Sequence, residues 1–342
     1  MKFLRLFGST SQRDAVLASI DYKILQKTAG VPGVSILQGQ GGGPVPPPVP
    51  PSPDPTVPFY IEDISGSDNI VQIKKNNEYG PTITIKKSLD GITWETMGET
   101  STTAITATIP ANGKLYLQCS TSNWGKSSFY NTINTTGNCN VGGNSMSLLW
   151  GQNWKNKTTF PSASIQYILA HIFRDNTHII NASGLVLPAT ILYNYSYSSM
   201  FYGCTSLTTV PVLPTTTLAG TGCYSQMFRG CTSLTTAPTL QTTTLTAGCY
   251  ANMFNGCTSL TTAPDLPAAT LAENCYFNMF YGCTKLNYIK CLATDISASR
   301  CTEEWLNGVA ASGTFVKDPS MSSWITGDNG IPSGWTVEDA AA

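Results

Sequence analysis

Residues 249–267 read CYANMFNGCTSLTTAPDLP, and close copies of this phrase recur through the C-terminal half of the chain. The Met-Phe pairs that mark the copies begin at Met200, Met227, Met253 and Met279, so the copies follow one another at a nearly constant spacing. A fixed period in the range of about 20–50 residues is typical of proteins built from stacked supersecondary units. One such unit cannot bury its own apolar face, so the sequence predicts that neighbouring units share a continuous core.

Each repeat predicts one coil of the chain with three parts. Residues 258–262 favour a short strand in which Leu260 points inward between Thr and Ser side chains. The Ala-Pro-Asp-Leu-Pro segment then turns the chain, because proline fixes φ and cannot donate to a strand ladder. Cys249 and Met253 are four residues apart, as on one face of a short helical turn, which Gly256 would end.

The apolar positions that recur with this period are predicted to form the repeat core. They are Cys204, Leu207, Cys223, Met227, Phe228, Cys231, Leu234, Cys249, Met253, Phe254, Cys257, Leu260, Cys275, Met279, Phe280 and Cys283. The chain has 11 cysteines and no C-x-x-C pair, so zinc-ribbon and thioredoxin-like sites have no support. We expect buried thiols that pack as small apolar side chains, with a Cys223–Cys231 disulfide as the alternative.

Hydroxyl side chains recur beside the inward leucines and make up a candidate adhesion face. This face consists of Thr205, Ser206, Thr208, Thr209, Thr232, Thr235, Thr258 and Thr261. An uncharged, regular, hydroxyl-rich surface is suited to binding glycan or protein, although threonine also simply favours strands. Tyr202, Tyr224, Tyr250 and Tyr276 either add exposed contact area or pack between repeats.

Upstream of the repeats, residues 59–137 are predicted to form a β-sandwich domain. Residues 82–86, 104–109 and 114–118 alternate between polar and apolar side chains, as strands with one buried face do. Gly-Pro, Asp-Gly and Asn-Gly turn signals separate these runs. Short strands at a spacing of about ten residues are typical of a sandwich. Residues 138–170 are expected to join this domain to the repeats and cap them.

Residues 1–58 predict an anchor and a spacer. The glycines and prolines of residues 41–58 predict a hinge followed by a stiff polyproline II segment. Two apolar phrases precede it, with the candidate anchor residues Phe3, Leu4, Leu6, Phe7, Val16, Leu17, Ile20, Ile24, Leu25, Val34 and Ile36. We interpret residues 1–40 as a segment that docks on a partner or trimerises, with a small helical element folded onto the β-domain as the alternative. The N-terminal apolar stretch is shorter than the roughly 7–15 residues of a signal-peptide core, so we expect synthesis in the cytoplasm without standard export.

Composition and motifs point away from several classes of function. The net charge of −1 provides no basic surface for nucleic acid, and no apolar run approaches the roughly 18 residues of a membrane span. GxSxG and Walker A motifs do not occur, and His171 and His178 lack HExxH spacing. We therefore predict no enzyme, no cofactor and no metal. A glycan-processing enzyme that uses Glu303 and Glu304 is the alternative, although adjacent acids are more often a solvated pair.

The CYxxMFxGCTSLTTAPxLP phrase resembles the BspA-like leucine-rich repeats, which are abundant in surface proteins of gut bacteria and in phages that infect them. Residues 286–296, 313–317 and 331–335 resemble the usual end of such arrays, and the resemblance covers residues 138–340. It implies a right-handed solenoid and a role in recognition or adhesion. Residues 1–58 depart from the cellular members of the family, which usually carry a signal peptide or a lipid anchor.

The expected fold class is thus mixed, with an anchor peptide, a Pro-rich spacer, a β-sandwich and a leucine-rich-repeat solenoid. The expected divisions are 1–40 for the anchor, 41–58 for the spacer, 59–137 for the sandwich, 138–300 for the solenoid with its N-terminal cap, and 301–342 for the terminal coil and C-terminal cap. We expect a bacteriophage virion fibre or decoration protein, a homotrimer that is anchored to the capsid or another virion protein through residues 1–40. It would be made in the host cytoplasm and present its repeats to host-surface or mucus glycan or protein. The alternatives are a tail fibre rather than a head fibre, and a bacterial cell-surface adhesin with atypical export.

Overall fold

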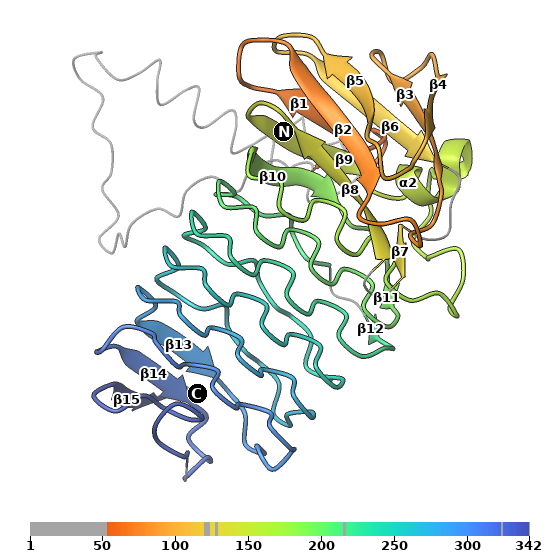
Figure 1. Cartoon of the computed structure of the whole chain (residues 1–342). Coiled ribbons are helices and arrows are strands. Elements are labelled where there is room, and N and C mark those ends of the chain that lie inside the picture. Colours follow the sequence, from red (N-terminus) through yellow and green to blue (C-terminus); the bar gives the residue numbers. More distant parts are fainter. Residues whose placement is uncertain (1–52, 120–123, 127–128, 215–216, 323, 342) are drawn as a thin grey trace, which may run out of the picture. The chain divides into compact units, whose positions relative to one another are not determined.

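The computed structural model describes residues 53–119, 124–126, 129–214, 217–322 and 324–341. Within these ranges the chain is mostly β-structure with very few helices. The helical elements described are α2 (Ser147–Trp150) and the 3-10 helix η1 (Gly151–Asn153), which follow each other directly. Figure 1 shows the sheets of the N-terminal part at one end of the described chain and the repeats leading away from them.

The larger sheet has six strands in the order β10-β9-β1-β6-β3-β4. Its strands are β1 (Tyr60–Asp63), β3 (Thr84–Ser88), β4 (Glu95–Glu99), β6 (Lys114–Cys119), β9 (Cys139–Asn144) and β10 (Ile179–Val186). Neighbouring strands pair antiparallel except β9 and β10, which pair parallel. Parallel pairing requires a long crossover, and the chain between these two strands includes α2 and η1.

A second sheet has four antiparallel strands in the order β5-β2-β8-β7. Its strands are β2 (Asn69–Lys75), β5 (Ile105–Ile109), β7 (Gly125–Lys126) and β8 (Phe129–Thr135). Alternate residues of β2 are buried, and Val71 and Ile73 join Ile61 and Leu117 of the larger sheet in one hydrophobic core. The strands expected around residues 82–86, 104–109 and 114–118 are present as β3, β5 and β6.

The larger sheet extends past the C-terminal end of the domain expected at residues 59–137, and residues before its N-terminal end are hydrogen-bonded to the sheet. Residues 55–58, expected in the spacer, lie beside the end of β9, where the backbone N–H of Asn144 donates to the carbonyl of Val57 (2.8 Å). The side-chain amide of Asn144 also donates to the carbonyl of Pro55 (3.1 Å). Strands β9 and β10 come from the region expected to belong to the repeats, yet β9 pairs with β1. The larger sheet therefore includes strands from both sides of residue 138, and residues 55–57 of the expected spacer bond to the end of β9.

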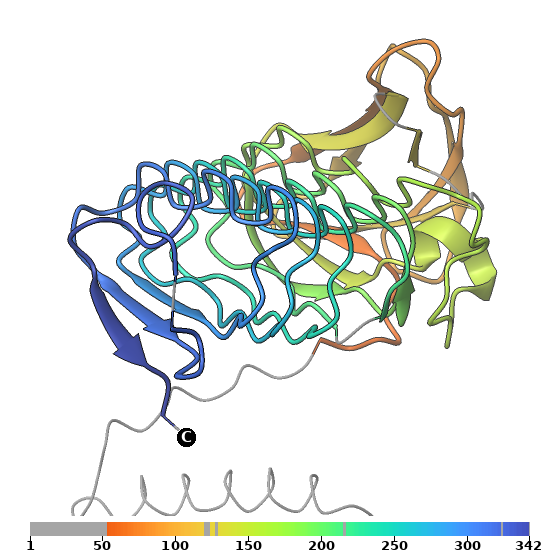
Figure 2. The ribbon, with the colours of Figure 1, turned by 90° about the horizontal axis from the view of Figure 1, so that it is seen from below.

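In the C-terminal half, repeat units of nearly constant length follow one another along the chain, and we call each of them a coil (Figures 1 and 2). Residues 222–230 and their equivalents form the turn side of the coils. There, the backbone N–H of Tyr224 donates to Cys249 O of the next coil (2.9 Å). The N–H groups of alternate residues bond within the coil, as when the N–H of Met227 donates to Tyr224 O (3.1 Å). The turn side is thus bonded both within and between coils.

The helical turn that the Cys-Met spacing predicts is not formed on the turn side. Every fourth residue there has a positive φ, as at Gly222 (62°), Gln226 (58°) and Gly230 (75°). A right-handed helix has negative φ throughout, so these residues reverse the chain into a series of tight turns. The four-residue spacing of apolar side chains fits both arrangements, and the N–H bonds to the next coil are made only by the turns.

Strands within the repeats are shorter than the sequence predicts. β11 (Ile191–Leu192) pairs parallel with β12 (Thr217–Leu218), and elsewhere coils are joined by isolated bridges such as Thr236 to Thr262. The last described coils end in a three-stranded parallel sheet. It consists of β13 (Tyr288–Cys291), β14 (Thr314–Lys317) and β15 (Thr336–Asp339).

The residues predicted to form the repeat core are all buried, from Cys204 to Cys283. Their aromatic rings stack from coil to coil, with centroids 5.6–5.8 Å apart in the series Phe201, Phe228, Phe254 and Phe280. Tyr224, Tyr250 and Tyr276 stack in the same way at 5.7 and 6.3 Å and are at most 2% exposed, so they pack between repeats. The cysteines are buried free thiols, and no Cys223–Cys231 disulfide is formed.

Candidate functional site

The candidate adhesion face is positioned by the glycine and cysteine that precede it in each coil. Gly256, with φ of 76°, ends the turn side, and the N–H of Thr258 donates to its carbonyl (3.0 Å). Cys257 then points inward, where its Sγ lies 3.1 Å from the carbonyl oxygen of Phe228. Leu260 is fully buried three residues later. With these two side chains inside, the hydroxyl side chains around them are left on the surface.

Nearly the whole predicted face is accessible to solvent. Thr205, Thr208, Thr209, Thr232, Thr235, Thr258 and Thr261 are exposed, and Ser206 is half-buried. The hydroxyl of Thr232 donates to Thr205 O of the preceding coil (3.3 Å), and that of Thr208 donates to Ile180 O (3.0 Å). In the described part of the chain, the hydroxyls of Thr235, Thr258 and Thr261 make no hydrogen bond, so they are available to a ligand.

Between two neighbouring coils this face is hollowed into a groove of about 470 Å³. One wall consists of residues 208–212 and the other of residues 235–239. The lining combines threonine hydroxyls with apolar side chains, among which Val212 is 69% exposed. An uncharged groove with both kinds of group can hold a ligand that has polar and apolar edges.

The groove lies where hydrogen bonding between coils is interrupted. On the side toward β10, the N–H of Thr208 donates to Ile180 O (2.9 Å), and the far wall is bridged to the following coil at Thr236. Among the described residues, no backbone hydrogen bond joins the two walls to each other. Each wall contains a proline, Pro211 or Pro238, which has no N–H to donate. The two coils are held together on the turn side and separate here.

Three of the predicted face residues, Thr208, Thr209 and Thr235, therefore meet in one groove. The other five are outside its lining, namely Thr205, Ser206, Thr232, Thr258 and Thr261. The sequence reasoning missed the apolar part of the groove. Its signal was residues 210–212, where Val-Pro-Val replaces the Ala-Pro-Thr and Ala-Pro-Asp of the next two repeats.

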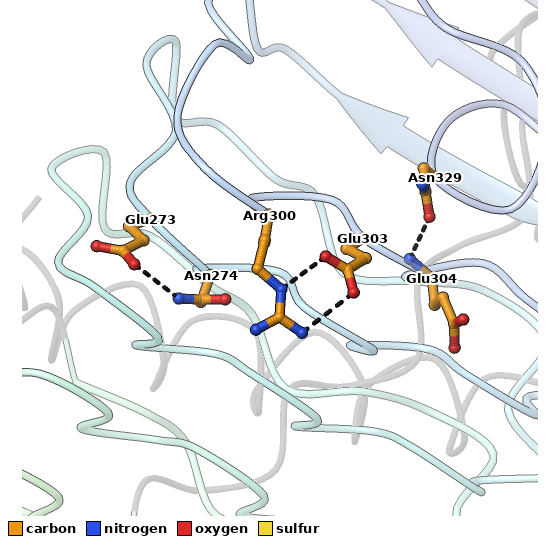
Figure 3. A network of polar contacts seen from close by, with 6 residues as sticks. All are labelled: Glu273, Asn274, Arg300, Glu303, Glu304 and Asn329. Carbon is orange, nitrogen blue, oxygen red and sulfur yellow. Dashed lines mark hydrogen bonds and ion pairs between the residues drawn. The ribbon is translucent and has the colours of Figure 1, made fainter.

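Glu303 and Glu304, the acids considered for glycan processing, lie in the terminal coil, where Glu303 is half-buried and Glu304 is exposed (Figure 3). Arg300 donates two hydrogen bonds to the carboxylate of Glu303, from Nε (2.6 Å) and from Nη2 (3.1 Å). The hydrogen bonds from Arg300 lower the pKa of Glu303, whereas a glycosidase acid needs a raised pKa. The backbone N–H of Glu304 donates to Asn329 Oδ1 (2.7 Å), and its side chain is exposed. Glu303 is thus paired with Arg300, and Glu304 is solvated.

The candidate anchor residues, from Phe3 to Ile36, lie outside the described residues. Within the described ranges, no group of three or more His, Cys, Asp or Glu side chains is arranged to hold a metal ion. The buried carboxylate of Asp63 instead accepts hydrogen bonds from Ser65 Oγ in its own loop (2.7 Å) and from the N–H of Asn112 in the turn before β6 (2.9 Å). No helix in the described part of the chain has the length and apolarity needed to cross a membrane.

No protein-family model matches the chain, and comparison with curated proteins and with solved structures gives no significant match.

Proposed function

We propose that this protein is a bacteriophage virion fibre or decoration protein that presents a leucine-rich-repeat solenoid for adhesion. The regular period of the repeats, the stacked aromatic rings and the bonds from each coil to the next support a solenoid of the BspA-like type. Two sheets around one core of Ile61, Val71 and Leu117 support a β-sandwich in front of it.

The observation that carries the adhesive role is the groove on the threonine face. Thr209 and Thr235 meet there on a surface without charged lining residues, and exposed Val212 lies in the same groove. Hydroxyl and apolar groups side by side complement a sugar ring, which has hydroxyl edges and a C–H face. The ligand of this groove is therefore a glycan of the host surface or of mucus, rather than nucleic acid or membrane.

The attachment role is assigned to residues 1–58 on the basis of their sequence. Two apolar phrases within residues 1–40 suit docking on a capsid or other virion protein, and the prolines of residues 41–58 suit a stiff spacer. In this arrangement the protein is made in the host cytoplasm, assembles as a homotrimer and projects from the head of the particle. The repeats then face the host.

Two experiments test the attachment role. Mass spectrometry of purified particles should find this chain among the virion proteins, and its presence in the envelope of uninfected cells would support a bacterial adhesin instead. A variant without residues 1–40 should keep its thermal unfolding transition and fail to join particles. Incorporation of that variant at wild-type level would contradict the anchor.

A third experiment tests the groove. The double variant Thr209→Ala/Thr235→Ala removes two hydroxyls from its walls, whereas Thr284→Ala removes an exposed hydroxyl from a coil outside the groove. We expect the double variant to bind host cells or mucin several-fold more weakly and the Thr284 control to bind as wild type. Equal binding by all three proteins would contradict the assignment of the groove.

A further inference from the structure

A second hollow, of about 440 Å³, lies on the six-stranded sheet and shares no residue with the threonine groove. Strands β3 and β6, the end of α2 and the 3-10 helix η1 enclose it. The side chains that matter for its chemistry are Thr84, Lys86, Gln118, Trp150, Gln152 and Asn153. Most of them are polar, and the described lining residues include no carboxylate.

Gln118 is a buried polar residue in the wall of this hollow, and its amide oxygen has no partner among the described residues. It pairs with Lys86 across β6 and β3, and only 4% of its surface is exposed. Its buried amide oxygen accepts no hydrogen bond from any residue that the structure describes. Buried amide groups nearly always have a partner, because an unpaired one lowers stability. Gln118 lines the hollow, and rotation of its amide group toward the hollow would let a ligand supply the missing hydrogen bond.

Trp150 provides an apolar wall in a fixed orientation. It is half-buried, and its Nε1 donates to the carbonyl of Thr159 (3.2 Å). The ammonium of Lys157 lies 4.2 Å from the centroid of the indole ring. A side chain held by two such contacts does not need to be ordered by a ligand, which favours binding.

Lys86 is the charged residue among the described residues that line the hollow, and the ammonium of Lys157 lies over the ring of Trp150. Lys86 is exposed and forms no ion pair with the described residues, whereas its neighbour Lys87 pairs with Glu95 (3.1 Å). With no acid among the described lining residues, the ammonium of Lys86 favours a ligand with a negative charge at that position.

We propose that this hollow binds a hexuronate unit of an acidic glycan. The amides of Gln118, Gln152 and Asn153 suit the ring hydroxyls, Trp150 suits the C–H face, and Lys86 suits the carboxylate. One indole beside several amides matches a single sugar ring, which presents a C–H face and hydroxyl edges. The site goes beyond the adhesive repeats and stands whether or not the chain belongs to a virion.

The test is isothermal titration of the full chain with a glucuronate-containing disaccharide and with the same disaccharide after reduction of its carboxyl group to an alcohol. Wild type should bind the acid about two- to fivefold more tightly, the range for an exposed ion pair. Lys86→Gln should abolish that preference. The matched control Lys285→Gln, on an exposed repeat lysine, should retain it.

Gln118→Met separates binding from stability. It replaces the unpaired amide with an apolar side chain of similar length, so the thermal midpoint should be unchanged or raised. Affinity for both disaccharides should fall about three- to tenfold, from the loss of one or two hydrogen bonds. Absence of wild-type binding at millimolar disaccharide, or wild-type affinity in both Gln118→Met and Lys86→Gln, would overturn the proposal. Thr209→Ala/Thr235→Ala leaves this hollow intact. A failure of the hexuronate proposal can therefore be told apart from a failure of the proposal for the threonine groove.

Discussion

At the scale of single residues, the repeat cysteines act as hydrogen-bond donors as well as apolar side chains. In the series Cys204, Cys231, Cys257 and Cys283, each Sγ lies 3.0–3.2 Å from a phenylalanine carbonyl oxygen of the preceding coil. A thiol is a weak donor that also packs well in an apolar core, which suits this position. Burial raises the pKa of the Cys283 thiol to about 12, so it stays protonated at neutral pH.

The first prediction is that these thiols are unreactive in the folded protein. At pH 8 an aromatic disulfide reagent should modify the repeat cysteines slowly, because the thiolate is the reactive form and burial blocks both its formation and access to it. After unfolding in guanidinium, all 11 cysteines should react. Rapid modification of Cys231 or Cys257 before unfolding, located by peptide mapping, would contradict the buried arrangement.

The second prediction is that the ionised carboxylate of Asp63 stabilises the protein and that this contribution is lost in acid. Burial raises the pKa of Asp63, but hydrogen bonds from the N–H of Asn112 and from Ser65 and Asn69 outweigh it and hold the pKa below its usual value. A lowered folded-state pKa contributes stability that is present above the unfolded pKa of about 3.8 and is lost as pH falls through the folded value.

Urea unfolding at pH 7 and pH 3 measures this contribution. Wild type should lose more stability between the two pH values than Asp63→Asn, which cannot titrate there. The exposed control Asp328→Asn should behave as wild type. An equal loss in all three proteins would show that Asp63 does not stabilise the loop as a carboxylate.

At the scale of elements, the turn side is a row of tight turns with a left-handed residue at every fourth position. Glycine occupies some of these positions, as at Gly230, but Gln226 and Asn252 occupy others with φ of 58° and 57°. A non-glycine residue in this region costs about 1–2 kcal/mol, less for asparagine. The bonds between coils, such as that from Gln226 N–H to Ala251 O (2.9 Å), hold it there.

The third prediction is that Gln226→Gly stabilises the protein. Glycine adopts positive φ without strain, and after its extra unfolded-state entropy we expect a net gain of about 0.5–1 kcal/mol. Gln226→Ala keeps the strain and should give no such gain. Ala251→Gly, at a neighbouring position without positive φ, should destabilise by about 0.5–1 kcal/mol. The midpoints of urea unfolding report all three, and a loss of stability in Gln226→Gly would contradict the left-handed turn.

At the scale of the whole molecule, as far as the structure describes it, the sheets are joined to the first coils by stacking and hydrogen bonds. Phe59 stacks on Phe173 (5.8 Å between ring centroids), and the N–H of Ile133 donates to Ile172 O (2.7 Å). β9 is paired with β1 on one side and with β10 on the other. Shared strands and a shared core couple the unfolding of elements that contact each other.

The fourth prediction is that a chain of residues 53–342 unfolds in one transition that includes both parts. A chain that begins at residue 138, the expected boundary, should aggregate, because it exposes the edge of β9 that β1 covers. Circular dichroism for the sheets and near-ultraviolet signals for the stacked aromatics should change together. Two separate transitions, or a soluble and folded chain from residue 138, would contradict the coupling.

The sequence by itself determined the period of the repeats, the buried residues such as Cys257, Phe254 and Leu260, and the exposure of the threonines between them. These follow from amino-acid type, since apolar side chains that recur once per coil must share a core. Only the tertiary structure decided the left-handed turns in place of a helical turn, because spacing of four residues fits both and the partners of the N–H groups are on another coil. It also decided the pairing of β9 with both β1 and β10, and the groove between Pro211 and Pro238. Strand pairing, and the interruption of hydrogen bonding between two coils, depend on contacts between residues that are distant in sequence. A local sequence pattern carries no information about such contacts.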